Sequence, residues 1–175
     1  MQEDYWEKAV AFHGHQCGGL AIGYKAALYA IKLLDLTFSK DEEVVCISEN
    51  NACGVDAIQV ILGCSVGKGN LLFHICGKQA FSFYKRSNGK SVRLVLKPRP
   101  QDLNREEILN YYLSLAPEDM FDLKETKIIL PEAAKLFESH ICQGCGEETG
   151  ANWVHLKGDK KLCSDCYKEY DPFKI

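Results

Sequence analysis

The stretch Phe12-His13-Gly14-His15-Gln16-Cys17-Gly18-Gly19-Leu20 decides how this chain is organised, because it places two imidazoles and a thiol directly before a long apolar segment. Imidazole and thiolate groups bind borderline or soft metals, and they act as base and nucleophile near neutral pH. We therefore predict a reactive or metal-binding site at the entrance of a buried helix. The alternative is two hydrogen-bonded core histidines beside an inert buried cysteine.

The apolar run from Leu20 to Leu34 is rich in Ala and Leu, which predicts a central core helix. Cys17 would then lie at its N-terminus, where unpaired N–H groups and the helix dipole favour a thiolate. Gly18 and Gly19 allow the backbone to turn closely before the helix begins.

A second cysteine follows the next predicted element. Residues 43–49 form an apolar run typical of a buried strand, and Cys53 comes just after it. Residues 55–62 have the spacing of a short helix with Asp56 in its first turn, so Cys53 repeats the arrangement of Cys17. The glycine-rich turn at 63–70 adds Cys64, but it lacks the P-loop pattern and does not indicate phosphate binding.

The remaining core elements predict an α+β fold with a mixed or antiparallel sheet and packed helices. Residues 71–76, 80–84 and 91–96 read as strands, which we expect to form an antiparallel meander. Asn104 and Glu107 are spaced as the capping box of a further helix. Residues 127–130 resemble a last short strand.

The tail carries two Cys-x2-Cys knuckles, Cys142/Cys145 and Cys163/Cys166, separated by seventeen residues. This gap lies within the zinc-module range of about 15–20 residues, and four thiolates satisfy tetrahedral zinc. A redox dithiol pair or an iron–sulfur site is the competing interpretation. We predict a small four-cysteine zinc-finger domain over residues 139–175, after a core domain over residues 1–138, with the metal supplying folding free energy.

Composition limits the classes of function. The 175 residues are 46% hydrophobic and 26% charged, as in an ordinary globular protein, and the net charge of −3 argues against nucleic acid as a partner. The acidic first residues do not resemble a signal peptide, and no apolar run would cross a bilayer, so we expect a cytoplasmic protein without membrane association. Nine cysteines, an odd number, then favour metal or thiol chemistry over disulfides.

Three motifs together resemble the FmdE family, named for the FmdE component of formylmethanofuran dehydrogenase: the stretches at 12–20, 53–59 and 63–71. The family commonly has Cys-Pro-Gly where this chain has Cys17-Gly18-Gly19. The resemblance implies a homodimer whose α+β core, followed by a zinc tail, holds a metal or active site in a cleft. By motif, the candidate residues are His13, His15, Cys17, Cys53 and Cys64, with Asp56 behind them.

Two hypotheses of function follow. In the first, the protein is an enzyme or enzyme subunit of one-carbon metabolism of the formylmethanofuran type. His15 and Cys17, with Cys53 or Cys64, would hold a second metal that has an open position. Without a metal, Cys17 would be a nucleophile and His15 its base.

In the second hypothesis the protein is a non-catalytic module. Its zinc tail docks a partner, and its core senses metal or thiol state. The acidic balance favours a protein partner over nucleic acid.

Overall fold

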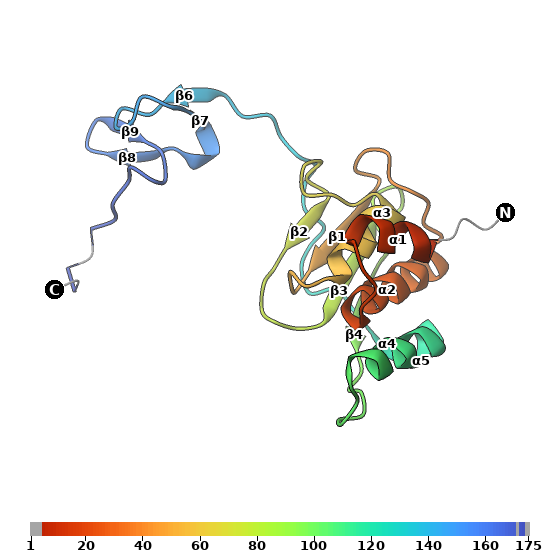
Figure 1. Ribbon diagram of the computed structural model, residues 1–175. Coiled ribbons are helices and arrows are strands. Elements are labelled where there is room, and N and C mark those ends of the chain that lie inside the picture. The colour runs from red at the N-terminus through yellow and green to blue at the C-terminus, as the bar shows by residue number, and fades with distance from the viewer. Residues whose placement is uncertain (1–4, 171, 174–175) are drawn as a thin grey trace. The chain divides into compact units, whose positions relative to one another are not determined.

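The computed structural model describes residues 5–170 and 172–173 (Figure 1). The chain divides into two compact units, one ending at Ala134 and the other beginning at Lys135. Within the described residues, no helix is both long enough and apolar enough to cross a membrane.

The first unit is built on a five-stranded sheet with strand order β2-β1-β3-β4-β5. Strands β1 and β2 pair in parallel, and all the other neighbours are antiparallel. The mixed sheet confirms the predicted fold class. The strand bounds are β1 Val44–Ser48, β2 Leu71–Phe73, β3 Ala80–Lys85, β4 Ser91–Leu96 and β5 Phe121–Lys124.

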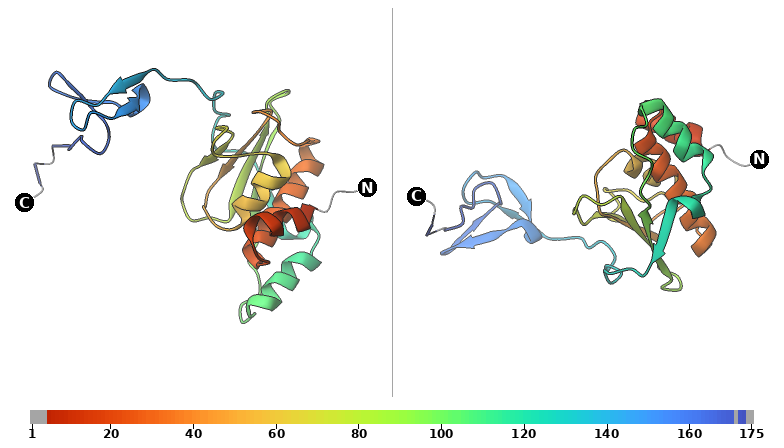
Figure 2. Two further views of the ribbon diagram at one scale, coloured as in Figure 1. Left: turned by 45° about the horizontal axis from the view of Figure 1, so that its top comes forward. Right: turned by 90° about the horizontal axis from the view of Figure 1, so that it is seen from below.

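The helices gather on one face of this sheet, where they enclose the larger apolar core (Figure 2). Helix α2 is the central element, and it packs against α1, α3, α4 and the sheet. The predicted capping box of α4 is confirmed, since Asn104 and Glu107 each accept a hydrogen bond from the other's backbone N–H. The helix bounds are α1 Tyr5–His13, α2 Gly18–Leu34, α3 Gly54–Leu62, α4 Arg105–Ser114 and α5 Pro117–Met120.

Helices α2 and α3 approach each other backbone to backbone. A Cβ atom on Gly23 would lie 1.9 Å from the carbonyl oxygen of Gly54, so no larger residue fits at position 23 without moving a helix. The contact brings the first turn of α2 against the start of α3. The loops that precede these two helices, which end in Cys17 and Cys53, are therefore held side by side.

The predicted antiparallel meander is wrong in its first strand. Strand β2 ends at Phe73 instead of Cys76, and it pairs with β1 rather than with β3. The connection from β1 through α3 to β2 is a crossover, which makes β2 parallel to β1. Local periodicity identifies a strand, but it does not say which neighbour the strand will pair with.

The predicted strand at 127–130 is also wrong. Ile128 and Leu130 pack on the sheet face opposite the helices, against Val45, Ile47 and Tyr84. The carbonyl of Ile128 accepts a hydrogen bond from the Tyr84 hydroxyl at 2.7 Å instead of joining a ladder. Apolar residues at these positions cover a sheet face, and the edge strand is β5.

The second unit consists of two short antiparallel ladders. Strands β6 (Ser139–Ile141) and β7 (Glu148–Gly150) form one ladder, and η1 (Ala151–Trp153) follows them. Strands β8 (His155–Lys157) and β9 (Lys160–Leu162) form a hairpin between the two Cys-x2-Cys knuckles. Among its described residues only Cys142 and Leu162 are buried. Two buried side chains do not make a hydrophobic core, so something else must hold this unit together.

Candidate functional site

Cys17 is fixed by the turn that joins α1 to α2. Helix α1 ends at His13, and Gly14 turns the chain with a positive φ of 91°. Cys17 then caps α2, with its Sγ accepting a hydrogen bond from the backbone N–H of Leu20 at 3.3 Å. This turn brings the Nε2 atom of His13 to 3.8 Å from Cys17 Sγ.

Cys53 reaches the same place from a loop after β1. The Asn50 side chain secures this loop, because its amide donates to the carbonyl of Lys78 and its oxygen accepts from the N–H of Ala52. Cys53 lies so close to α2 that a Cβ atom on Gly19 would be 3.1 Å from Cys53 Cβ. Burial, followed by the contact with Cys17, raises the pKa of the Cys53 thiol above its ordinary value.

His13, Cys17 and Cys53 form what we call the core cluster. Their candidate ligand atoms, one imidazole nitrogen and two sulfurs, all lie within 4.8 Å of one another. Asp56 stands behind them with its Oδ2 atom 2.7 Å from His13 Nδ1, and Gln59 donates to its other oxygen at 3.2 Å. A carboxylate that accepts from Nδ1–H leaves the Nε2 lone pair free for a metal, as is usual for metal-bound histidines.

The core cluster is accessible from two pockets. One, of about 580 Å³, is lined by Cys17 and Cys53 together with the start of α4. The other, of about 400 Å³, contains His13, Cys53 and Asp56. Three protein ligands beside open space leave a coordination position for a small molecule, which is the arrangement of a catalytic rather than a structural metal site.

His15 and Cys64 take other positions. The His15 ring lies 4.6 Å from the His13 ring and lines the 580 Å³ pocket, so the imidazole whose nitrogen joins the two thiols is that of His13. Cys64 is fully buried, and its Sγ donates to the carbonyl of Val44 at 3.6 Å. Burial raises the pKa of the Cys64 thiol to about 12. The structure does not bring Cys64 to the core cluster.

The sequence singled out His13, but not as a metal ligand. Two histidines precede Cys17, and the direction of each ring depends on the turn at Gly14. Helical spacing could not identify the ligand, because α1 ends at His13 and α2 begins at Gly18, so the residues between them are not helical.

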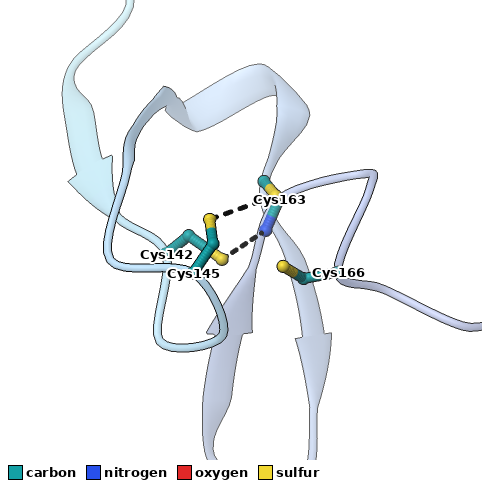
Figure 3. A group of neighbouring side chains, drawn as sticks. All are labelled: Cys142, Cys145, Cys163 and Cys166. Carbon is teal, nitrogen blue, oxygen red and sulfur yellow. Dashed lines mark hydrogen bonds between the residues drawn. The ribbon is translucent and has the colours of Figure 1, made fainter.

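The four thiols of the tail come together as their spacing predicts (Figure 3). Cys142, Cys145, Cys163 and Cys166, which we call the tail cluster, have sulfurs within 4.8 Å of one another. Cys142 Sγ accepts the backbone N–H groups of Gly144 at 3.3 Å and Cys163 at 3.2 Å. Backbone N–H groups, first that of Cys163 and then that of Cys145, lower the pKa of Cys142 to about 6. The neighbouring thiols of Cys163 and Cys142 raise the pKa of Cys166 to about 12, so a metal ion bound by the four sulfurs would have to displace protons from the cluster.

The fold and the two clusters define an α+β protein with a histidine–cysteine pocket and a separate four-cysteine module. A family model described as "FmdE, Molybdenum formylmethanofuran dehydrogenase operon" matches residues 12–142. The chain belongs to the FmdE family.

Two relatives extend over nearly the whole chain. The first is a crystal structure of a tungsten formylmethanofuran dehydrogenase FmdE-like protein from Syntrophus aciditrophicus. It is 29% identical, with a TM-score of 0.67, and the match covers 94% of this chain and 90% of that one. The second is an Archaeoglobus fulgidus protein described as a probable S-adenosyl-L-methionine-binding protein. It is 26% identical over 93% of this chain, which spans 52% of that relative's length.

Proposed function

We propose that the protein is an enzyme, or an enzyme subunit, in which the core cluster holds a metal ion that acts on a one-carbon or acyl-type ligand. The observation that carries the proposal is the convergence of His13, Cys17 and Cys53 within 4.8 Å beside an open pocket. The chemical class comes from the family, whose description refers to formylmethanofuran dehydrogenase.

The chain's own residues have distinct roles in this proposal. Cys17 and Cys53 bind the ion as thiolates, so binding releases their protons to solvent. His13 presents Nε2 while Asp56 holds its Nδ1–H, which fixes the ring and strengthens it as a ligand. The bound metal would serve as a Lewis acid that polarises an oxygen of the ligand in the open position.

A metal-free version of the same site uses Cys17 as the nucleophile. Here His13, with Nε2 3.8 Å from the thiol, would be the base in place of His15, and Asp56 would orient the ring. We test this version by the rate of iodoacetamide labelling at Cys17, measured by mass spectrometry. A drop of at least tenfold in the His13→Ala variant supports it, and an unchanged rate contradicts it.

The tail cluster is proposed to bind zinc in a closed structural site. Four thiolates fill the tetrahedral shell, which leaves no position for a substrate. The unit is then a brace or a docking element for a protein partner, in a cytoplasmic homodimer. Light scattering during size-exclusion chromatography tests the dimer, and a monomeric mass contradicts it.

The decisive experiment for the core metal is elemental analysis of the purified full-length protein. We expect about two metals per chain, about one in the Cys142→Ser/Cys145→Ser variant and about one in Cys53→Ser. Cys76→Ser is the matched control, because Cys76 is an exposed thiol outside both clusters, and it should keep both metals. One metal in the wild type and none in the tail variant would exclude the core metal.

S-adenosyl-L-methionine is the first ligand to test. The Archaeoglobus fulgidus relative described as a probable S-adenosyl-L-methionine-binding protein matches 93% of this chain. The pocket of about 580 Å³ at the core cluster is in the size range of small-molecule sites. Isothermal titration should give one site per chain in the wild type and a loss of binding when Ile108→Trp fills the pocket wall. Absence of heat in the wild type would remove this ligand from the proposal.

A further inference from the structure

The pocket at the core cluster has a second cavity beside it. This cavity, of about 450 Å³, shares Gly18, Gly19 and Ile108 with the 580 Å³ pocket. The two therefore lie next to each other along the start of α2 and the side of α4. The second cavity is lined by neither Cys17 nor Cys53, so it has no role in metal binding. We call it the distal pocket.

The distal pocket contains a phenol without a hydrogen bond. Tyr112 is 4% exposed and lines this pocket, and its hydroxyl bonds to none of the residues that the structure describes. Within that same part of the chain, no fully enclosed side-chain oxygen or nitrogen lacks a partner, so the Tyr112 hydroxyl is accessible to solvent. A hydroxyl that is hydrated in the free protein can exchange its water for a polar group of a ligand.

The charged residues of the distal pocket are cationic. Lys97 and Arg99 line it, and none of its lining residues is acidic. Burial raises the pKa of Tyr112, and the positive charge of Arg99 opposes this shift. The guanidinium of Arg99 therefore lies near the phenol of Tyr112. Arg99 donates one hydrogen bond, to the carbonyl of Pro100, and its other N–H groups have no partner among the described residues.

The rest of the wall is apolar. Side chains of Ile22, Leu96, Pro98 and Ile108 line the distal pocket together with the cationic residues. A hydrocarbon or aromatic body would be stabilised there by burial of its surface. The two linings together thus contain the thiols of the core cluster, apolar side chains, and a phenol with two cations.

We propose that the two pockets together bind one amphipathic small molecule, with its carboxylate or phosphate on Tyr112, Arg99 and Lys97 and its reactive end at Cys17 and Cys53. This assignment rests on the proposed function for the reactive end only. The anionic end depends on residues that touch no metal ligand, and it is tested without reference to the metal.

The test uses two fluorescent probes of the same shape. One is 1-anilinonaphthalene-8-sulfonate, which carries a charge, and the other is the neutral N-phenyl-1-naphthylamine. In the full-length protein, Arg99→Gln should weaken the sulfonate probe about fivefold and Tyr112→Phe about tenfold. Both variants should leave the neutral probe within twofold of the wild type. Lys90→Gln, an exposed turn lysine, is the charge-matched control and should change neither probe.

Each outcome of these measurements either supports or overturns the proposed anion site. Equal effects on both probes, or no effect on either, would overturn the anion site, as would a Lys90→Gln effect as large as that of Arg99→Gln. Shifts of the Gly18 and Gly19 amide resonances on binding place the probe in the shared wall, and unshifted amides would overturn that location. Displacement of the sulfonate probe by hexanoate identifies a carboxylate ligand, and displacement by hexyl phosphate identifies a phosphate. If hexanamide displaces it equally, the charge requirement fails.

These results are separable from the metal analysis. A wild-type protein with one metal per chain but a charge-selective distal pocket would reject the proposed function and retain the anion site. Two metals per chain without charge selectivity in probe binding would retain the proposed function and reject the anion site.

Discussion

The core cluster and the tail cluster are both groups of side chains that could hold a metal ion, but they are held in place by different forces. Packed helices hold the residues of the core cluster. The contact of Gly23 with Gly54 fixes α2 against α3 independently of any metal. The tail ligands lie in the turns that follow β6 and β9, in a unit with two buried side chains, Cys142 and Leu162, among its described residues. A metal in the core cluster would therefore be an addition to a fold that packing already holds, whereas a metal in the tail cluster would take the place of a hydrophobic core.

Removing the tail metal should have the largest effect. In the Cys142→Ser/Cys145→Ser variant we expect residues from Lys135 onward to lose their dispersed amide resonances, because structural zinc contributes about 10–16 kcal/mol of apparent folding free energy. Resonances of the core should stay in place. If the tail amide resonances stay dispersed without metal, the tail does not need a metal to fold, and this difference between the two units is contradicted.

The core should respond most strongly to the loss of its buried ion pair. Arg93 and Glu49 are 4% and 7% exposed, and two hydrogen bonds of 2.5 and 2.8 Å join them. Glu49→Gln leaves the guanidinium buried without its counter-charge, so the free energy of unfolding in urea should fall by about 3–5 kcal/mol. Asp122→Asn, an exposed acid on β5, is the control, and an equal loss there would contradict this explanation.

The same ion pair gives the core a pH signature. Arg93 first, and then the Cys76 thiol and Lys78, hold the pKa of Glu49 below its ordinary value. Its contribution to stability is therefore complete above the unfolded pKa of about 4.3 and declines as pH falls from there through the lowered folded pKa. Urea unfolding from pH 6 to pH 3 should show this decline in the wild type. In Glu49→Gln the contribution of this group to the slope should be absent.

Gly23→Ala tests whether packing places the core ligands. The added Cβ would lie 1.9 Å from the Gly54 carbonyl, so α2 must move away from α3. We expect a loss of roughly 3 kcal/mol in unfolding free energy, the upper end for overpacking, together with loss of the core metal. Gly67→Ala is the control, since nothing lies within 4 Å of its Cβ position. Full metal content in Gly23→Ala would refute the role of this contact.

Asp56→Asn should give the smallest change. The amide still reaches His13 Nδ1, but it carries no charge to strengthen the imidazole, so metal affinity of the core cluster should fall about 10–100-fold. Competition with a chromophoric chelator measures this affinity. Stability without metal should change little, and an unchanged affinity would show that Asp56 does not support the ligand.

Local features of the structure followed directly from the sequence. The capping box of α4 depends on two residues three positions apart, and the four-cysteine module depends on two Cys-x2-Cys pairs separated by seventeen residues. Elements whose structure depends on contacts with distant residues were harder to predict from the sequence. The apolar pattern at 127–130 fits a strand and a face-covering segment equally well, and only the position of Tyr84 and its neighbours separates them.

The sequence by itself therefore determined the two-part organisation, the ligand set of the tail and the family. The tertiary structure decided which histidine faces Cys17, that Cys64 lies buried away from the pocket, and that β2 runs parallel to β1. The physical reason is separation along the chain. His13 and Asp56 are 43 positions apart, and the close crossing of α2 and α3, rather than any local spacing, brings such groups into contact.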